Sequence, residues 1–368
     1  MSVQKKKPFS VLYALLFLFA LAAKLSAQTG RGPQPDAGKK AYLMVYFKDD
    51  THSLYMALSK DGYRFTDINQ ARPVIAGDTI AEQKGIRDPY IYRAPDGWFY
   101  MALTDLHIFG QKAGYRTTEW ERDGKQYGWG NNRGLVLMKS KDLVHWSHQV
   151  LRVDKSFPEL ADIGCAWAPE MIYDDQAKKT MLYFTMRFGN KREQVYYTYM
   201  NKDFSRMETL PRVLFNYPKA GISCIDADIT RVGNEYHLFY VPHDGGAGVK
   251  QMVSGSLNAG YQYDDRWYDP EPAACEAPFV YKLIGRNKWI LVYDIYGISP
   301  SNFGFSETTD FIHFKDLGRF NEGVMKATNF SSPKHGAVVT LTRKEAQYLA
   351  DNWKLDMNFS SIRSSIFK

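Results

Sequence analysis

Five short segments of the sequence combine an acid or a histidine with a proline or a small residue directly before or after it. They are Arg87-Asp88-Pro89, Trp167-Ala168-Pro169-Glu170, Ile225-Asp226-Ala227-Asp228, Cys275-Glu276-Ala277-Pro278 and Lys334-His335-Gly336. Any one acid of this kind can simply mark the turn into a strand. A carboxylate is costly to bury unless it is paired or used, so the repetition favours a working site over packing.

Carboxyl groups that share one cavity can act as a general acid and a general base. Inverting cleavage of a glycosidic bond is one such reaction. A protonated carboxyl gives its proton to the leaving oxygen, while a carboxylate about 6.5–9.5 Å away activates water. A third carboxylate close to the acid keeps it protonated by like-charge repulsion. This chemistry requires a fold that brings distant segments together.

Each of the five segments belongs to one copy of a repeated unit that would supply such a fold. Runs rich in aromatic and β-branched residues, typical of strands, cover residues 42–47, 98–104, 181–187, 236–240 and 289–293. Third strands are expected to end near Ser59-Lys60-Asp61, Ser140-Lys141-Asp142, Asn201-Lys202-Asp203, Ser306-Glu307 and, more weakly, within residues 254–261. Five such copies predict the blades of a propeller.

The fifth copy is split between the two ends of the chain. Its second and third strands lie at residues 42–59, and a matching first strand, residues 335–341, lies near the C-terminus. A ring closed in this way leaves no exposed sheet edge. The sequence therefore predicts an all-β, five-bladed β-propeller at residues 41–342, with the first strands lining the axis. Thr342 and Glu345 form a capping-box pattern, which predicts a short helix to about Trp353 within a C-terminal helix and tail, residues 343–368.

Residues 1–27 are expected to be a secretory signal peptide, followed by a flexible lead-in at residues 28–40. Three lysines precede an apolar stretch, and a small residue stands at the cut. An uncleaved membrane anchor is the alternative, but the apolar stretch is shorter than the roughly 20 residues that a spanning helix needs. We therefore expect export to the periplasm or the exterior, with no membrane association after cleavage.

The charge and the cysteines exclude several other classes. The net charge of +7 would fall to +3 on cleavage, because residues 1–27 hold four lysines and no acid. Outside the signal there is no long Lys/Arg cluster, so no nucleic-acid partner is expected. The three cysteines, Cys165, Cys224 and Cys275, have no metal-ligand spacing and indicate neither a zinc site nor a disulfide framework.

The order of the five acid- and histidine-bearing segments resembles glycoside hydrolase family 43 over residues 41–350. The resemblance implies a five-bladed propeller that acts on arabinose-, xylose- or galactose-containing polysaccharides. It implies that Asp88 is the general base, that Asp226 tunes the acid and orients the substrate, and that Glu276 is the general acid. Asp228 is the alternative to Asp226, but it lies deeper along the strand. Ala277 departs from the family, where many relatives have glycine.

The resemblance also implies supporting roles for two residues and bears on cofactors. Glu170 matches a position that supports the site. His335 resembles a histidine that faces the central channel, often near a hydrated cation that is commonly calcium; the alternative is a buried histidine that is hydrogen-bonded at the start of the closing strand. No cofactor is expected to be required, and a structural calcium ion in the channel is the metal to look for.

The connection from His107 to Arg133 is unusually long and carries Tyr115, Trp120, Tyr127 and Trp129. Long loops of this kind are usually functional or disordered. Aromatic rings pack on the apolar faces of sugars, so the loop is expected to form one wall of a pocket. The alternative is that these rings form a private core of the loop. The expected substrate-binding residues are Arg87, Trp120, Trp129, Trp167, Glu170 and His335.

The function expected from the residues and the resemblance together is exo-acting, inverting hydrolysis of a carbohydrate substrate. An α-L-arabinofuranosidase is favoured, with β-xylosidase or β-galactosidase as alternatives. A non-catalytic sugar-binding propeller would need the aromatic residues but not three acids in this order. A retaining, fructan-cleaving propeller is disfavoured because the Asn-Asp-Pro-Asn motif of that family is absent.

Overall fold

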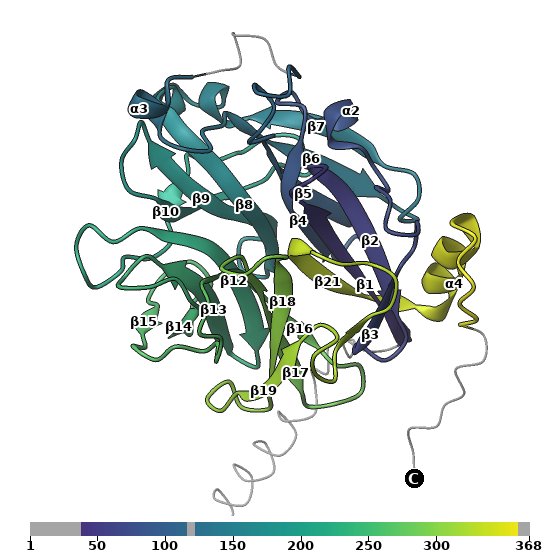
Figure 1. The fold of residues 1–368 in the computed structure, drawn as a ribbon. Helices are drawn as coiled ribbons and strands as arrows, with labels where there is room; N and C mark the ends of the chain where they lie inside the picture. The colour runs from purple at the N-terminus through teal and green to yellow at the C-terminus, as the bar shows by residue number, and fades with distance from the viewer. Residues whose placement is uncertain (1–37, 116–121, 360–368) are drawn as a thin grey trace, which may run out of the picture. The chain divides into compact units, whose positions relative to one another are not determined.

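A computed structural model describes residues 38–115 and 122–359, and the strands among them form five β-sheets (Figure 1). The inner strand of each sheet packs against the inner strands of the two neighbouring sheets, in a closed ring with the order β21, β4, β8, β12, β16. The chain is therefore an all-β, five-bladed propeller, as the sequence predicts.

Four blades are continuous in sequence and consist of four antiparallel strands each. The first has β4 (Ile86–Arg93), β5 (Phe99–Asp105), β6 (Gly134–Ser140) and β7 (Ser147–Arg152). The second has β8 (Ile163–Asp174), β9 (Lys179–Phe188), β10 (Gln194–Tyr199) and β11 (Arg212–Val213). The third has β12 (Cys224–Val232), β13 (Glu235–Pro242), β14 (Lys250–Ser254) and β15 (Gln262–Tyr263). The fourth has β16 (Cys275–Lys282), β17 (Trp289–Ile295), β18 (Asn302–Thr308) and β19 (Lys315–Arg319).

The closing blade joins the two ends of the ring, as expected. Its order is β21 (Lys334–Thr342), β1 (Lys39–Lys48), β2 (Ser53–Ser59), β3 (Arg64–Asp67) and β20 (Lys326–Ala327). In Figure 1 the yellow β21 lies beside the purple β1, and seven β1 residues from Tyr42 to Lys48 pair with β2 on its other side. β1 begins at Lys39 and so overlaps the last two residues of the expected lead-in. The sequence did not reveal β20, which pairs in parallel with β3 over only two residues.

A repeated turn follows the third strand of several blades and explains the Ser/Asn-x-Asp pattern. After β6, the Ser140 hydroxyl accepts the Leu143 N–H at 2.9 Å, and the Asp142 carboxylate accepts the His145 N–H at 2.8 Å. The same bonds follow β2 and β18. After β18 the turn is built by Thr308 and Asp310, so the expected alignment on Ser306-Glu307 is two residues too early.

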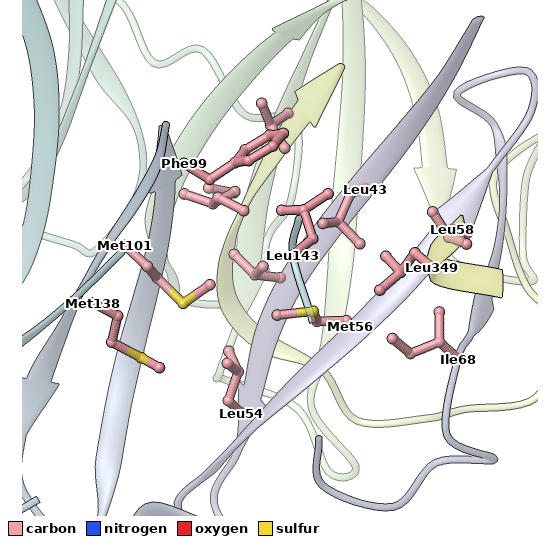
Figure 2. Close-up of a cluster of buried hydrophobic side chains, with 14 of the residues drawn as sticks. Leu43, Leu54, Met56, Leu58, Ile68, Phe99, Met101, Met138, Leu143 and Leu349 are labelled. Carbon is pink, nitrogen blue, oxygen red and sulfur yellow. The ribbon is translucent and has the colours of Figure 1, made fainter. Parts of the chain in front are cut away.

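The closing blade and the blade of β4 to β7 share a hydrophobic core (Figure 2). Leu43 and Met56 face Phe99 and Met101 across the junction, and all four are fully buried. The helix α4 (Arg343–Asn352) seals this core with Leu349. It begins with the predicted capping box, in which the Thr342 hydroxyl accepts the Glu345 N–H at 3.2 Å. The remaining helices are short: α2 (Gly77–Ile80), α3 (Gly124–Tyr127), and the 3₁₀ helices η2 (Val153–Lys155) and η3 (Pro158–Leu160).

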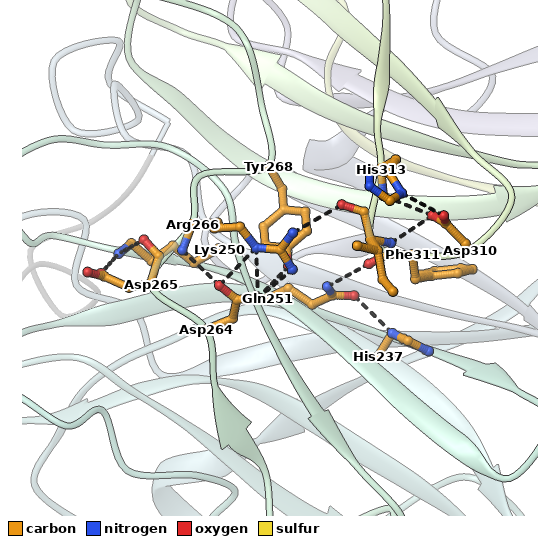
Figure 3. A network of polar contacts seen from close by, with 11 residues as sticks. His237, Lys250, Gln251, Asp264, Asp265, Arg266, Tyr268, Asp310, Phe311 and His313 are labelled. Atoms are coloured by element: carbon orange, nitrogen blue, oxygen red, sulfur yellow. Dashed lines mark hydrogen bonds and ion pairs between the residues drawn. The ribbon is translucent and has the colours of Figure 1, made fainter.

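A polar network joins the blade of β12 to β15 with the blade of β16 to β19 (Figure 3). Gln251 on β14 is 2% exposed. Its Oε1 is hydrogen-bonded to His237 Nδ1 at 2.9 Å, and its Nε2 donates to the Phe311 carbonyl at 3.1 Å. Arg266 pairs with Asp264 at 2.6 Å and also donates to the carbonyl of Ile312. The amide of Gln251 is the buried part of this link.

Gln251→Leu is expected to lower the free energy of unfolding by about 1–3 kcal/mol. The substitution keeps the volume but leaves two buried polar groups, His237 Nδ1 and the Phe311 carbonyl, without their partner. Urea denaturation followed by tryptophan fluorescence measures the loss. Gln262→Leu is the matched control, because the side chain of Gln262 is exposed and its amide donates to the carbonyl of Gly260, two residues earlier. Equal stability of the two variants would contradict a structural role for the network.

The expected signal peptide, most of the expected lead-in, Trp120 and the end of the C-terminal tail fall outside the described residues. Within residues 38–115 and 122–359, no helix is long and apolar enough to span a membrane.

Candidate active site

Each inner strand carries a β-bulge near its first residues, and one residue of each bulge has a positive φ. These residues are Asp88 (51°), Ala168 (46°), Asp226 (52°), Ala277 (53°) and His335 (21°). Non-glycine residues seldom adopt positive φ, and bulges turn a side chain out of the regular alternation of a strand. The five bulges lie at the same end of the ring of inner strands, and this end is the candidate site.

The bulges also show which of the expected residues are equivalent. Asp88, Asp226 and His335 occupy the bulge itself, whereas Glu276 comes one residue before its bulge and Glu170 two residues after. The five segments therefore do not supply five equivalent side chains. They supply one set at the mouth of the channel and a second, deeper set.

Asp88 is held as an ionised carboxylate. The Thr104 hydroxyl on β5 donates to its Oδ2 at 2.6 Å, and the His335 Nδ1 lies 3.4 Å from its Oδ1. Burial by itself would raise the pKa of Asp88, but His335, Arg87 and Thr104 together lower the pKa well below its usual range. A buried carboxylate that stays ionised is suited to accept a proton from water.

Asp226 has the opposite environment. Burial, together with the nearby charges of Glu276 and Asp88, raises the pKa of Asp226 to about 7, against the opposing charge of His335. Its Oδ2 accepts the Ala277 N–H at 3.2 Å, and its own N–H donates to the Thr185 hydroxyl at 3.1 Å. Because Ala277 follows Glu276 directly, this bond fixes Asp226 beside the expected general acid.

Glu276 faces a lysine from the closing blade. The Lys334 Nζ lies 3.3 Å from Glu276 Oε1 and 3.3 Å from Asp294 Oδ2, and the Glu276 side chain is 25% exposed. Asp294 on β17 stands directly opposite Glu276 in the β16–β17 register. Burial, against the opposing charge of Lys334, raises the pKa of Asp294 to about 7.

Glu170 and Asp228 form the deeper set. The Tyr183 hydroxyl donates to Glu170 Oε2 at 2.8 Å, and both acids are almost fully buried. Burial and then the charge of Asp228 raise the pKa of Glu170 well above its usual value, and burial raises the pKa of Asp228 to about 7. Glu170 thus contacts Tyr183 and Asp228 below the mouth of the channel, rather than standing where a sugar would enter.

His335 is positioned to support Asp88. Burial alone would lower the pKa of His335, but the neighbouring Asp88 carboxylate raises it. In the part of the chain that the structure describes, no group of three or more His, Cys, Asp or Glu residues is arranged to hold a metal ion. These described residues offer no direct set of ligands for calcium, and a hydrated calcium ion near His335 stays a prediction.

The described part of the long loop, with α3, lies at the same end of the propeller, between β5 and β6. Arg187 holds it in place by donating to the carbonyls of Tyr127 and Trp129, and its guanidinium lies 4.7 Å from the Trp167 ring. The Trp167 indole N–H donates to the Gly130 carbonyl at 2.9 Å. Trp129 is 69% exposed and forms a T-shaped contact with Trp167, so its ring is available to a ligand rather than buried in a core of the loop.

Arg87 does not project freely into the site. Its guanidinium pairs with Asp49 at 2.7 Å and lies 4.7 Å from the Phe47 ring. Asp49 also lies 3.7 Å from the Lys334 Nζ. Arg87 therefore orders the rim of the site together with Asp49.

Sequence reasoning did not assign Lys334, Asp294, Asp49 or Tyr296. Lys334 belongs to the segment that carries His335, but the sequence around a single lysine does not indicate which acids it will contact. Tyr296 is 41% exposed, with its ring 5.8 Å from the Lys334 Nζ, and follows β17 directly. The sequence did offer a signal for Asp294: it lies near the end of an aromatic second strand, as Asp105 does in another blade.

A protein-family model and one known protein match the sequence of this chain. Residues 38–347 match the model of a glycosyl hydrolase 43-related family, described as a probable glycosyl hydrolase domain. An α-L-arabinofuranosidase of Bifidobacterium longum is 24% identical over 249 residues, which are 60% of this chain and 21% of that protein. The chain thus spans about a fifth of the length of this relative.

Solved structures share the fold at low identity. An endo-1,4-β-xylanase from Bacteroides thetaiotaomicron superposes with a TM-score of 0.52 at 12% identity, covering 81% of this chain and 93% of that one. An exo-1,5-α-L-arabinanase from a bovine ruminal metagenomic library gives 0.50 at 14%, covering 77% and 99%. A family 43 β-1,3-galactosidase gives 0.51 at 11%, covering 73% and 54%. By the match over residues 38–347, the chain belongs to the glycosyl hydrolase 43-related family.

Proposed function

We propose that this glycoside hydrolase removes terminal sugars from plant-type glycans with inversion at the anomeric carbon. Asp88 is the general base, Glu276 the general acid, and Asp226 the carboxyl that keeps the acid protonated and orients the sugar. The observation that carries the proposal is the contrast between two buried acids in the same site. Surrounding groups hold Asp88 ionised, whereas the pKa of Asp226, beside Glu276, is raised to about 7.

In the proposed reaction, Asp88 takes a proton from a water molecule as the water oxygen attacks the anomeric carbon. The bond from that carbon to the leaving oxygen breaks, and Glu276 gives its proton to this oxygen. The products are the sugar with inverted configuration and the free alcohol. His335 and Thr104 hold Asp88 in place for the attack.

An α-L-arabinofuranoside is the favoured substrate. The name of the matched relative supports this choice, although that protein is about five times longer than the matched region. The likeness to a xylanase and a galactosidase makes β-xylosides and β-galactosides the next substrates to test. Exo action is proposed because the long loop places Trp129 and Tyr115, both exposed, at the site end of the propeller. Export to the periplasm or the exterior is also proposed, from residues 1–27.

The test is an assay of the purified chain without residues 1–27. Aryl α-L-arabinofuranosides, β-xylosides and β-galactosides are compared first, followed by the corresponding polymers. We expect release of monosaccharide from one of these glycosides. Asp88→Asn, assayed at the same concentration, is the control for contaminating activity. Sugar binding without hydrolysis in the whole panel would instead support a non-catalytic, sugar-binding propeller.

Asp226→Asn is expected to move the alkaline limb of the pH–activity profile to lower pH. Above its pKa of about 7, Asp226 is ionised, and its charge opposes the loss of the proton from a neighbouring carboxyl. The substitution removes this charge, so the general acid loses its proton at lower pH. The measurement is kcat/KM against pH for an unactivated glycoside. A limb that does not move would contradict this role for Asp226.

A further inference from the structure

Lys334 is a buried cation with three acidic neighbours. Its side chain is 7% exposed, and its ammonium lies 3.3 Å from Glu276, 3.3 Å from Asp294 and 3.7 Å from Asp49. Lysine is almost never buried unless it is paired. The closing blade thus brings a fixed positive charge to the acid side of the site.

Asp294 is the anchor of this charge. It is fully buried, and its Oδ2 accepts the His335 N–H at 3.3 Å as well as facing Lys334. Its Oδ1 has no hydrogen-bond partner within the described residues. Because Asp294 is held by β17 and by the backbone of β21, Lys334 keeps a partner whether or not Glu276 carries a charge.

We propose that Lys334 is a positioning residue of the proposed reaction: anchored by Asp294, its ammonium stabilises the negative charge that appears on Glu276 when that carboxyl gives up its proton. The inference rests on the proposed role of Glu276. In the proposed reaction Glu276 starts with the proton that it donates, and Lys334 then has Asp294 as its charged partner. As the proton moves to the leaving oxygen and the glycosidic bond breaks, the new carboxylate meets an ammonium already in place. Such a contact is stronger in the transition state than in the ground state, so it accelerates the step.

Lys334 and Asp226 act on the acid in opposite directions. Asp226 opposes the loss of the proton, whereas Lys334 favours it, so the two together set the pH range in which Glu276 can donate. The charged and titratable groups around Glu276 are Lys334, Arg87, Asp226, Asp294, Tyr296 and His335. Lys334 is the one of these for which the structure records an ion pair with Glu276.

The test compares Lys334→Met, Lys334→Arg and the control Lys288→Met. Lys288 pairs with Glu307 at 2.7 Å at the other end of the same blade as Glu276. Each variant is assayed with two glycosides of the sugar that the wild-type protein cleaves, one with an alkyl alcohol and one with an acidic phenol as the leaving group. Thermal unfolding of every variant shows whether it is folded.

We expect Lys334→Met to lower kcat/KM for the alkyl glycoside by about 10-fold or more, and for the aryl glycoside much less, because an acidic phenol leaves without a proton. The alkaline limb of its pH profile should rise by about 1–3 pH units, since an opposite charge at this range shifts a carboxyl by that amount. Lys334→Arg, which keeps the positive charge, should retain most of the wild-type kcat/KM for the alkyl glycoside and most of the wild-type position of the alkaline limb. Lys288→Met should change neither.

Equal losses on both substrates with an unmoved alkaline limb would overturn the inference and leave Lys334 a structural residue only. If Lys334→Met does not fold, the double variant with Asp294→Asn removes both buried charges and is judged by the same two readouts. An independent readout is ¹³C NMR titration of the Glu276 carboxyl, whose midpoint should be higher in Lys334→Met than in the wild type. An unchanged midpoint overturns the inference even if the protein hydrolyses no glycoside, whereas absence of hydrolysis with a raised midpoint counts against the proposed function alone.

Discussion

Glu276→Ala is expected to reduce the cleavage of natural glycosides by about 10²- to 10⁴-fold, the usual contribution of a general acid. An alkoxide is a poor leaving group and needs the proton that Glu276 supplies. An aryl glycoside with an acidic phenol should lose far less, because the phenolate departs without a proton. The measurement is kcat/KM for the two substrate classes with the wild type and the variant.

The control for this result is a folded protein with an intact base. Glu276→Ala removes a partner of Lys334, but Asp294 and Asp49 remain close to that ammonium. Thermal unfolding should therefore differ little from the wild type. Equal losses on the natural and the aryl glycoside would leave the role of Glu276 as acid unsupported, and Glu170 and Asp228 would be the next residues to substitute.

Asp88→Ala is expected to reduce hydrolysis of both substrate classes alike, by about 10²- to 10⁴-fold. Water must be activated in either case, so the leaving group does not matter. Azide needs no base, and adding it should restore part of the activity on the aryl glycoside. The product would be a glycosyl azide of inverted configuration, identified by NMR.

His335→Asn with Asp88 intact is the useful comparison for this variant, because it removes the imidazole that lies 3.4 Å from Asp88 without removing the base. It should lower the rate without rescue by azide. If azide instead failed to rescue Asp88→Ala in a folded protein, or gave a product of retained configuration, Asp88 would not be the base.

The sequence was sufficient to predict the architecture because each blade carries its own signals. Aromatic second strands and Ser/Asn-x-Asp turns recur in the chain, and the turn after β6 shows why: Ser140 and Asp142 satisfy the backbone N–H groups of Leu143 and His145. The split closing blade followed from the same pattern. The turn at Thr308 was misplaced by two residues because threonine replaces serine there.

The site was predictable only in part. The residues that stand at the bulges or beside them, Asp88, Asp226 and Glu276, lie in short recognisable segments. The partners that give them their charge states come from neighbouring blades: Thr104 and His335 contact Asp88, and Lys334 contacts Glu276. Such contacts depend on how the ring closes, which the local sequence of one blade does not encode.

The configuration of the sugar at the moment of its release tests the central claim most directly. ¹H NMR of a freshly started reaction on the aryl glycoside that is cleaved best records the first-formed anomer before mutarotation. If Asp88 activates water as the base while Glu276 protonates the leaving oxygen, the product is the inverted anomer, for example β-L-arabinofuranose from an α-L-arabinofuranoside. Release of the retained anomer would contradict the proposed roles of Asp88 and Glu276.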